Sequence, residues 1–312
     1  MRFDRVLVTG GAGFIGSHLV DTLVDRGVDV VVVDNLTTGV RDNLHPKATF
    51  VEADVRDTQA VRRVIRSGVG AVVHEAARVS VRSSVDAFLE DAGINILGTL
   101  SLLEACRGGP VRRIVFASSM AVYADNPRGG PISEDHPRDP RSPYGLAKWA
   151  CERYVSLLAE GLGIDAVSLR YFNVYGPRQG STPYVGVITI FINELLRGRP
   201  PVVFGDGQQT RDFVSVRDIV DGTLRALESD VGTDVFNLGS GRGRTVNEIA
   251  RMLIDRLRPG TQPLIAPARA EEVRHSVADL SKAGSALGYE PAHDLEDRID
   301  EIIEWCRARP GA

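Results

Sequence analysis

The fold of this chain is decided by Val6-Leu7-Val8-Thr9-Gly10-Gly11-Ala12-Gly13-Phe14-Ile15-Gly16-Ser17-His18-Leu19. The aliphatic residues up to Thr9 predict a buried strand, and the glycines that follow predict a tight turn. Apolar side chains then recur at helical spacing, at Leu19, Leu23 and Val24. Strand, turn and helix in this order are typical of the first unit of a dinucleotide-binding sheet.

The three glycines of the turn have separate physical roles, at the spacing G-x-x-G-x-x-G. Gly10 permits a sharp turn, Gly13 removes a side chain where a pyrophosphate approaches the backbone, and Gly16 allows close packing. The N-terminus of the following helix attracts the same anion. A second apolar run, Val28–Val33, leads to Asp34, eighteen residues after Gly16. A carboxylate there accepts hydrogen bonds from both ribose hydroxyls and repels a 2′-phosphate, so the pattern predicts NAD rather than NADP.

The composition is that of an ordinary globular protein. The 312 residues are 43% hydrophobic and 25% charged, and the formal net charge is −4, which argues against nucleic acid as a partner. The apolar runs are too short to span a bilayer, so we expect no membrane segment, and the first strand leaves no room for a signal peptide. The histidines form no ligand cluster, so no metal site is expected. Three widely separated cysteines predict reduced thiols and a cytoplasmic location: Cys106, Cys151 and Cys306.

Strand-like runs alternate with helical stretches in the first half of the chain. Further strands are predicted at residues 49–54, 71–74, 113–117 and 166–171, and helices at 58–67, 84–107 and 144–160. This alternation predicts an α/β fold, a Rossmann-type doubly wound parallel sheet, with ligands beyond the C-terminal strand ends. The residues expected at those ends are Asp34, Asp54, Ala76-Ala77, Ser118-Ser119 and Tyr171-Phe172-Asn173.

The texture of the sequence changes at about Val174, where turn-rich segments begin. We therefore predict two lobes: an NAD-binding Rossmann domain over residues 1–173 and a smaller α/β substrate-binding lobe formed mainly by 174–312. The segment from about 214 to 238 contains one predicted helix and one predicted strand that could belong to either lobe.

A predicted helix opens with Ser142-Pro143-Tyr144-Gly145-Leu146-Ala147-Lys148, where Ser142 is the expected N-cap. Tyr144 and Lys148 are four residues apart and share one helix face. A nearby ammonium and a cationic nicotinamide ring lower the pKa of a phenol, which makes Tyr144 a candidate general acid and base. A serine at the preceding strand end, Ser118 or Ser119, can bond a substrate oxygen and relay its proton.

Taken together, these motifs resemble those of the extended short-chain dehydrogenase/reductases, and within them the UDP-glucose 4-epimerases. The resemblance covers almost the whole chain. The matching motifs are Thr9–Gly16, Asp34-Asn35-Leu36, Asp54, His74-Glu75-Ala76-Ala77, Asn95, Ser118-Ser119, Val122-Tyr123, Tyr144 with Lys148, Arg170–Arg178, Thr210–Phe213 and Asn237-Leu238-Gly239.

The residues before Val122-Tyr123 favour one reaction within this family. Dehydratases of the family carry Thr-Asp-Glu there, because the elimination of water needs an acid and a base, and the related decarboxylases place a glutamate at the position of Ala121. This chain has Ser119, Met120 and Ala121 instead, so both acids are absent. Ser119 is the residue that an epimerase needs.

The resemblance implies a mechanism of oxidation followed by reduction. Tyr144 takes the proton of the sugar 4-hydroxyl, through or beside Ser119, while C4 delivers hydride to NAD. The 4-keto sugar turns about its diphosphate link, and the hydride returns to the opposite face. No net oxidation results, so the resemblance implies tightly bound NAD as the cofactor.

The resemblance also assigns site residues by position. Ser119, Tyr144 and Lys148 are the expected catalytic residues. The expected cofactor contacts are Gly10, Gly13, Phe14, Ile15, Gly16, Asp34, Asn35, Leu36, Thr37, Thr38, Gly39, Asp54, Val55, Ala76, Ala77, Arg78, Asn95, Ser118, Tyr144, Lys148, Tyr171 and Phe172. The expected UDP-sugar contacts are Ser80, Ser119, Met120, Tyr144, Asn173, Gly186, Val187, Ile188, Val202, Phe204, Gln209, Arg211, Arg269, Glu272 and Ser276.

Three departures from the family pattern affect this assignment. Val79 stands where some relatives keep a lysine, and Ala124 replaces the usual glycine. Arg269-Ala270-Glu271-Glu272 stands where Arg-Pro-Gly-Asp is usual, which leaves the ribose contact of Glu272 open. Ser276 occupies a position where a tyrosine blocks N-acetylated sugars, so its small side chain predicts that they are accepted.

The sequence therefore predicts a UDP-glucose/UDP-galactose 4-epimerase that also accepts UDP-N-acetylglucosamine and UDP-N-acetylgalactosamine. One alternative is a sister enzyme that acts on UDP-glucuronate or a deoxysugar nucleotide, although Pro183–Ile188 resembles the neutral-hexose version. A second is a non-catalytic NAD-sensing regulator, which the intact Tyr144 and Lys148 disfavour. A homodimer through the helices near Ser84–Arg107 and Tyr144–Glu160 is expected from the family.

Overall fold

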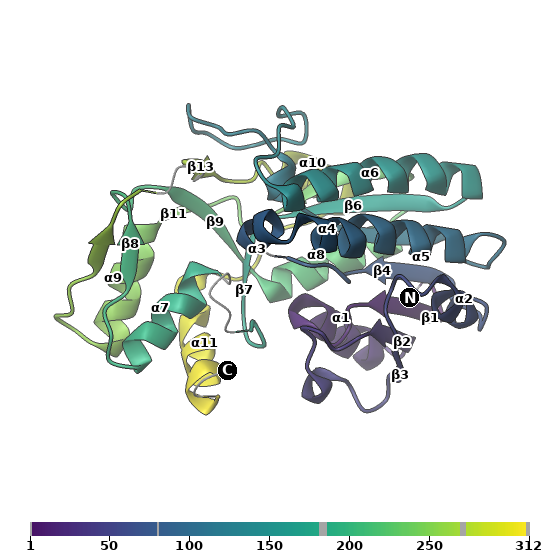
Figure 1. Ribbon diagram of the computed structural model, residues 1–312, viewed down its shortest axis with the longest axis horizontal. Coiled ribbons are helices and arrows are strands. Elements are labelled where there is room, and N and C mark those ends of the chain that lie inside the picture. The colour runs from purple at the N-terminus through teal and green to yellow at the C-terminus, as the bar shows by residue number, and fades with distance from the viewer. Residues whose placement is uncertain (1, 80, 181–185, 269–272, 310–312) are drawn as a thin grey trace.

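Seven parallel strands form the central sheet of the computed structural model, which describes residues 2–79, 81–180, 186–268 and 273–309 (Figure 1). Their spatial order is β10-β6-β5-β4-β1-β2-β3, so the order reverses at β1 and β4, and this confirms the predicted Rossmann-type doubly wound sheet. The strands are β1 (Arg5–Thr9), β2 (Asp29–Asp34), β3 (Thr49–Glu52), β4 (Ala71–His74), β5 (Arg113–Ser119), β6 (Asp165–Tyr171) and β10 (Asp234–Leu238).

Apolar residues on the helices cover both faces of this sheet. On one face, α1 (Phe14–Asp25) and α8 (Val216–Glu228) pack against the strands through side chains such as Leu19 and Ile219. The opposite face is covered by three helices that share a second apolar cluster: α2 (Thr58–Ile65), α5 (Gly98–Cys106) and α6 (Pro143–Leu162). Strands buried on both faces explain the continuous β-branched run of Val30–Val33.

The smaller lobe is organised around β9 (Thr210–Ser215), which gathers short strands from distant parts of the chain. Figure 1 shows this lobe on the left, with α7, α9 and α11 below β9. The partners of β9 are β7 (Asn173–Tyr175), β11 (Gly243–Thr245) and β13 (His275–Ser276), while β8 (Val202–Phe204) pairs with β12 (Leu264–Ala266). A third apolar cluster joins α7 (Val187–Leu196), α9 (Val246–Leu257) and α11 (Leu295–Ala308).

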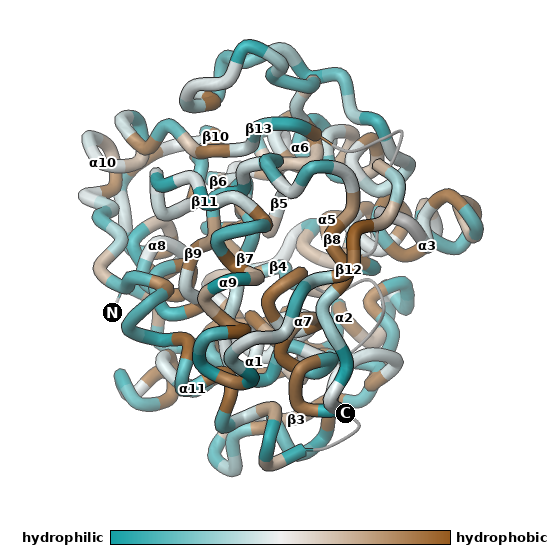
Figure 2. The backbone as a smooth tube through the Cα atoms, turned by 90° about the vertical axis from the view of Figure 1, so that its left-hand side faces the viewer, coloured by the Kyte–Doolittle hydropathy of each residue, from teal (hydrophilic) through white to brown (hydrophobic). Residues whose placement is uncertain are grey.

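The segment 214–238 supplies α8 and β10, and β10 pairs with β6 in the main sheet. The following α10 (Ser281–Leu287) packs against β10 and α8. Figure 2 shows the smaller lobe from its outer side, with hydrophobic chain around β8 and β12 and hydrophilic chain along the peripheral loops. The short helices η1 (Arg41–Asn43) and η3 (Met120–Val122) follow β2 and β5.

The stretch Ser84–Arg107, predicted as one helix, is helical almost throughout but is divided into shorter elements. It forms α3 (Val81–Asp86), α4 (Phe88–Ala92), a π-helical turn η2 (Gly93–Leu97) and then α5. The carbonyl of Asn95 accepts hydrogen bonds from Thr99 Oγ1 at 2.7 Å and Cys151 Sγ at 3.2 Å. These side-chain bonds accompany the wider helical turn, a feature that is frequent at functional sites.

Candidate active site

The glycine loop between β1 and α1 is closed tightly around its own backbone. Gly10 has a φ of 71°, in the region that favours glycine. A Cβ added at Gly16 would lie 2.2 Å from the carbonyl oxygen of Gly10, and one added at Gly10 would lie 2.7 Å from the amide nitrogen of Ala76. The N-cap of α1 is Gly13, which has no capping side chain, so the first N–H groups of the helix remain available to an anion.

Asp34 ties this loop to the turn after β2. Its carboxylate accepts hydrogen bonds from the amide of Leu36 at 2.8 Å and the amide of Ala12 at 3.0 Å. A Cβ added at Gly39 would lie 2.8 Å from Asp34 Oδ1, so the turn packs directly on this side chain. The glycine cradle and the carboxylate at the strand end fit the diphosphate and the ribose of NAD.

Two further groups hold the same edge of the sheet. Asn35 Nδ2 donates to Asp54 Oδ2 at 3.0 Å, and Arg56 holds the pKa of the Asp54 carboxyl at about 2. Asn95 bonds both the amide and the carbonyl of Arg78, at 3.0 and 3.1 Å, and so fixes the loop after β4. The other predicted cofactor residues also lie at or just beyond the C-terminal strand ends: Phe14, Ile15, Thr37, Thr38, Val55, Ala77, Ser118, Tyr171 and Phe172.

The three predicted catalytic residues come together where β5 ends and α6 begins. Ser142 caps α6, as predicted, by accepting a hydrogen bond from the amide of Gly145 at 3.1 Å. The side chain of Ser119 lies close enough to the Tyr144 phenol to lower its pKa. Lys148 Nζ donates to the carbonyl of Ala117 at 2.7 Å and lies 5.9 Å from the centre of the Tyr144 ring.

The protein alone does not lower the pKa of the Tyr144 phenol. Burial raises this pKa to about 12, and the hydrogen bond from Ser119 opposes the increase, whereas the charges of Asp91 and Glu75 add to it. Burial also lowers the pKa of Lys148, which three nearby carboxylates oppose. A cationic group beside Tyr144 would therefore act against an environment that disfavours the phenolate.

A buried polar network that the sequence did not reveal supports this centre. Arg170 is 2% exposed and donates twice to Glu152, from Nε to Oε1 at 2.9 Å and from Nη2 to Oε2 at 2.7 Å. Ser118 Oγ donates to Glu152 at 2.5 Å, and Arg170 also donates to Tyr123 Oη at 2.8 Å. Because Glu152 lies one turn after Lys148 on α6, the network fixes the helix against the end of β5.

The smaller lobe brings several predicted substrate residues close together. Ser276 on β13 pairs with Arg211 on β9, and Asn173 Nδ2 donates to the carbonyl of Asp212 at 3.2 Å. Gln209 Nε2 donates to the carbonyl of Phe204 at 3.0 Å, at the end of β8.

The remaining predicted substrate residues are spread over three elements. Met120 lies in η3, and Val202 begins β8. Gly186 is the N-cap of α7, Val187 follows it, and Ile188 is buried with 1% exposure. Ser80, Arg269 and Glu272, and the Pro183-Tyr184-Val185 part of the hexose segment, lie outside the described residues.

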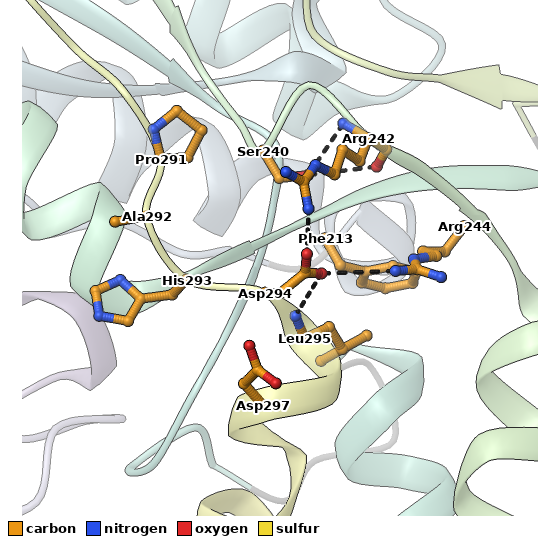
Figure 3. A pocket seen from close by; sticks show the side chains of 10 residues that line it. All are labelled: Phe213, Ser240, Arg242, Arg244, Pro291, Ala292, His293, Asp294, Leu295 and Asp297. Carbon is orange, nitrogen blue, oxygen red and sulfur yellow. Dashed lines mark hydrogen bonds and ion pairs between the residues drawn. The ribbon is translucent and has the colours of Figure 1, made fainter.

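A separate cavity of about 210 Å³ contains none of the predicted site residues (Figure 3). Figure 3 shows the Asp294 carboxylate between the guanidinium groups of Arg242 and Arg244, which are thus already paired. The residues that line the cavity are Phe213, Ser240, Arg242, Arg244, Pro291, Ala292, His293, Asp294, Leu295 and Asp297. This cavity is therefore a poor candidate for the cofactor or for a phosphate.

Within the described part of the chain, no helix is both long and apolar enough to cross a bilayer. The same residues contain no group of three or more His, Cys, Asp or Glu side chains that could hold a metal ion.

The Rossmann sheet, its glycine loop and the Ser119–Tyr144–Lys148 arrangement define an NAD-linked enzyme of the short-chain dehydrogenase/reductase class. Comparison with known proteins defines the group more closely. The chain belongs to the NAD-dependent epimerase/dehydratase family, whose model matches residues 6–239. It is an isomerase that uses NAD.

Its relatives include epimerases that act on different UDP-sugars. A putative UDP-glucose 4-epimerase of Methanocaldococcus jannaschii is 42% identical over 97% of this chain and 98% of its own. The UDP-glucose 4-epimerase of Thermotoga maritima, solved with UDP-glucose, has a TM-score of 0.93 at 40% identity, covering 97% of this chain and 99% of that one. The UDP-N-acetylglucosamine 4-epimerase of Methanobrevibacter ruminantium, solved with UDP-N-acetylmuramic acid, also has a TM-score of 0.93, at 36% identity, covering 99% and 100%.

Proposed function

We propose that this protein is a UDP-hexose 4-epimerase that interconverts UDP-glucose and UDP-galactose through a transient 4-keto sugar. The observation that carries the proposal is the meeting of Ser119, Tyr144 and Lys148 at one strand end. Met120 and Ala121 follow Ser119, so no carboxyl group stands where elimination of water would need one. The likeness to the Thermotoga maritima enzyme supports the choice of hexose.

The side chains of this centre suit reversible proton transfer at a sugar hydroxyl. Tyr144 takes the proton of the 4-hydroxyl and later returns it, and Ser119, which acts on the phenol, relays that proton. Lys148, held by the carbonyl of Ala117, supplies positive charge on the same helix face. NAD, when bound, accepts a hydride from C4 of the sugar and gives it back.

We propose that the β9 region binds the nucleotide part of the substrate. Arg211 supplies the guanidinium for the diphosphate, an arrangement that suits the geometry of these oxygens. Asn173 and Phe204 lie on strands that reach the same lobe, at β7 and β8. A firm grip on the nucleotide, with few contacts to the sugar, allows the 4-keto sugar to turn.

The same site is proposed to accept UDP-N-acetylglucosamine and UDP-N-acetylgalactosamine. Ser276 is fully buried, and its Oγ has no hydrogen-bond partner among the described residues. A serine leaves room that a tyrosine would fill, and its unpaired hydroxyl suits a polar acetamido group. The Methanobrevibacter ruminantium relative shows that N-acetylated substrates occur within this group.

A homodimer is proposed on the face formed by α4, η2 and α6. Large apolar side chains are exposed there, including Phe88 at 58%, Leu89 at 78% and Leu157 at 66%. Exposed apolar side chains on neighbouring helices suit an isologous contact with a second copy. Sedimentation equilibrium tests the dimer, and a monomer at micromolar concentration would refute it.

The three cysteines are buried and form no disulfide, which supports the cytoplasmic location that we propose.

The experiment that tests the function is incubation with a panel of UDP-sugars without added NAD. We expect C4 epimers of UDP-glucose and of UDP-N-acetylglucosamine, with no net formation of NADH. A 4-keto-6-deoxy product would refute the epimerase. Activity on UDP-glucose with none on UDP-N-acetylglucosamine would refute only the role proposed for Ser276. If UDP-glucuronate were the single substrate epimerised, the proposed neutral-hexose substrate would be refuted.

A further inference from the structure

Glu75 is a carboxyl group at the cofactor edge of the sheet that takes no part in the steps above. It directly follows β4, and its amide donates to the carbonyl of Thr9 at 3.1 Å, where the glycine loop begins. A Cβ added at Gly10 would lie 2.9 Å from the carbonyl carbon of Glu75. The backbone of Glu75 therefore packs against the loop that fits the cofactor diphosphate.

The side chain of Glu75, which follows β4, is hydrogen-bonded to a residue of β6, on the far side of β5. The hydroxyl of Tyr171, at the end of β6, donates to Glu75 Oε1 at 2.9 Å and lies 2.9 Å from Thr223 Oγ1 on α8. Because β5, which ends in Ser119, lies between β4 and β6, this hydrogen bond links the ends of two strands that are not neighbours in the sheet.

Glu75 also interacts with the catalytic residues of α6. Burial raises the pKa of its carboxyl to about 7, while the hydrogen bond from Tyr171 and the charge of Lys148 oppose the increase. The ionised carboxyl in turn raises the pKa of Tyr144. The titratable groups that act on Glu75 are thus Tyr171 on β6 and Lys148 and Tyr144 on α6, whereas β1 and α8 contribute only the groups of Thr9 and Thr223, which do not titrate.

The charged groups close to Lys148, which include the half-buried Glu75, do not balance. Glu75 and Asp91 both act on this lysine, and among the described residues neither forms an ion pair like that of Glu152 with Arg170, although the charge of Arg78 also acts on Asp91. Asp91 is 1% exposed, and burial raises the pKa of its carboxyl, while the side chain of Asn95 and the charge of Arg78 oppose the increase. When all three groups are ionised, two carboxylates lie close to one ammonium, and this local excess of negative charge favours a cation.

We propose that Glu75 is the counter-charge for the oxidised nicotinamide ring and so biases the bound cofactor toward its oxidised form. A bound cofactor would extend from the glycine loop, which suits its diphosphate, toward Tyr144, where hydride transfer would take place. The backbone of Glu75 packs against the glycine loop, and its carboxyl acts electrostatically on Tyr144. The oxidised ring is a cation and the reduced ring is neutral, so a fixed carboxylate stabilises only the oxidised form.

This role is that of a positioning residue for charge. It favours the return of the enzyme to its resting state after the sugar has been oxidised. The inference depends on the use of NAD and not on which sugar the enzyme accepts, so it can fail or succeed separately from the proposed substrate.

The bias depends on pH in a defined direction. Above about pH 7 the carboxyl of Glu75 is ionised with either form of the cofactor, and the oxidised form has its full advantage. The cationic ring lowers the pKa of Glu75 further, so reduction of the cofactor takes up an additional proton between the lowered pKa and about 7. Below the lowered pKa the carboxyl is neutral with both forms, and the advantage is lost.

The test is the reduction potential of the bound cofactor, measured on the holoenzyme with redox dyes over a series of pH values. Glu75→Gln keeps an acceptor for the Tyr171 hydroxyl and removes only the charge. Above pH 7 we expect this variant to favour the reduced cofactor about tenfold or more relative to the unaltered enzyme, because an adjacent opposite charge shifts equilibria by that amount. Tenfold corresponds to about 30 mV for a two-electron couple.

Two controls make the result specific. Glu134→Gln removes another buried carboxyl, which accepts a hydrogen bond from the amide of Asn237 at 2.8 Å and should leave the potential unchanged. Tyr171→Phe removes a hydrogen bond that lowers the pKa of Glu75, so the inflection in the plot of potential against pH should move to higher pH. The same change made in the Glu75→Gln variant should not move it. An unchanged potential and pH slope in Glu75→Gln, or an equal effect of Glu134→Gln, would overturn the proposal.

Discussion

The two lobes hold their functional side chains by different means. At the cofactor edge, most of the predicted residues lie at or just beyond the ends of strands of one parallel sheet, which brings together segments that are far apart in sequence. In the smaller lobe, β9 alone pairs with β7, β11 and β13. The comparison teaches that the first site follows from a repeated local pattern, whereas the second depends on a few long-range pairings. Changes in the two lobes should therefore affect cofactor and substrate separately.

The largest effect on turnover is expected at Tyr144, where the cofactor bound by one lobe and the sugar bound by the other would react. Tyr144→Phe removes the proton carrier while keeping the ring, so turnover should fall about 10²- to 10⁴-fold. Bound NAD and the affinity for UDP should remain, as measured by cofactor content after purification and by UDP titration. Loss of the cofactor in this variant would show that Tyr144 has a structural role instead.

Breaking the buried pair beneath the catalytic centre should have the largest effect on stability. Glu152→Gln leaves the Arg170 guanidinium buried without its counter-charge, and we expect the free energy of unfolding to fall by about 3–5 kcal/mol. Denaturant unfolding of the holoenzyme measures this. The matched change Glu104→Gln affects a carboxylate that is 48% exposed, and it should cost less than about 1 kcal/mol. Equal costs would contradict the central role of the network.

A change in the glycine loop should affect the cofactor lobe alone. Gly16→Ala forces a Cβ to within 2.2 Å of the Gly10 carbonyl oxygen, and such overpacking costs about 1–3 kcal/mol. The protein should lose bound NAD and retain UDP binding by calorimetry. Gly161→Ala is the matched control, because a Cβ at this helical position meets nothing within 4 Å and should stabilise α6 slightly. Retention of NAD by Gly16→Ala would refute the close packing described here.

The corresponding change in the smaller lobe is expected to have a slightly smaller effect and the opposite selectivity. Asp212 is fully buried and accepts hydrogen bonds from the amides of Ser240, Gly241 and Ala278 at 2.7, 2.9 and 3.0 Å. In Asp212→Asn the new amide group opposes one of these donors, which should cost about 1–2 kcal/mol. KM for the UDP-sugar should rise while the NAD content stays constant. A loss of NAD here would remove the distinction between the lobes.

The sequence by itself determined the cofactor half of this protein. The glycine spacing, the position of Asp34 at a strand end and the Ser142 cap before Tyr144 are local patterns, and local backbone geometry turns them into the observed sheet and helix. The helix predicted over Ser84–Arg107 is interrupted by a π-helical turn, where the Asn95 carbonyl accepts hydrogen bonds from Thr99, four residues further on, and from Cys151, fifty-six residues away. No local propensity encodes such a contact.

Only the tertiary structure decided which groups share a charge environment. Glu75 reads in sequence as part of a strand-end motif, yet the fold places its carboxyl against Tyr171, ninety-six residues away, and within the field of Lys148. The pairing of Glu152 with Arg170 and of Ser276 with Arg211 is likewise invisible before the strands are ordered. Electrostatic interaction depends on distance and burial in space, and the order of strands sets both.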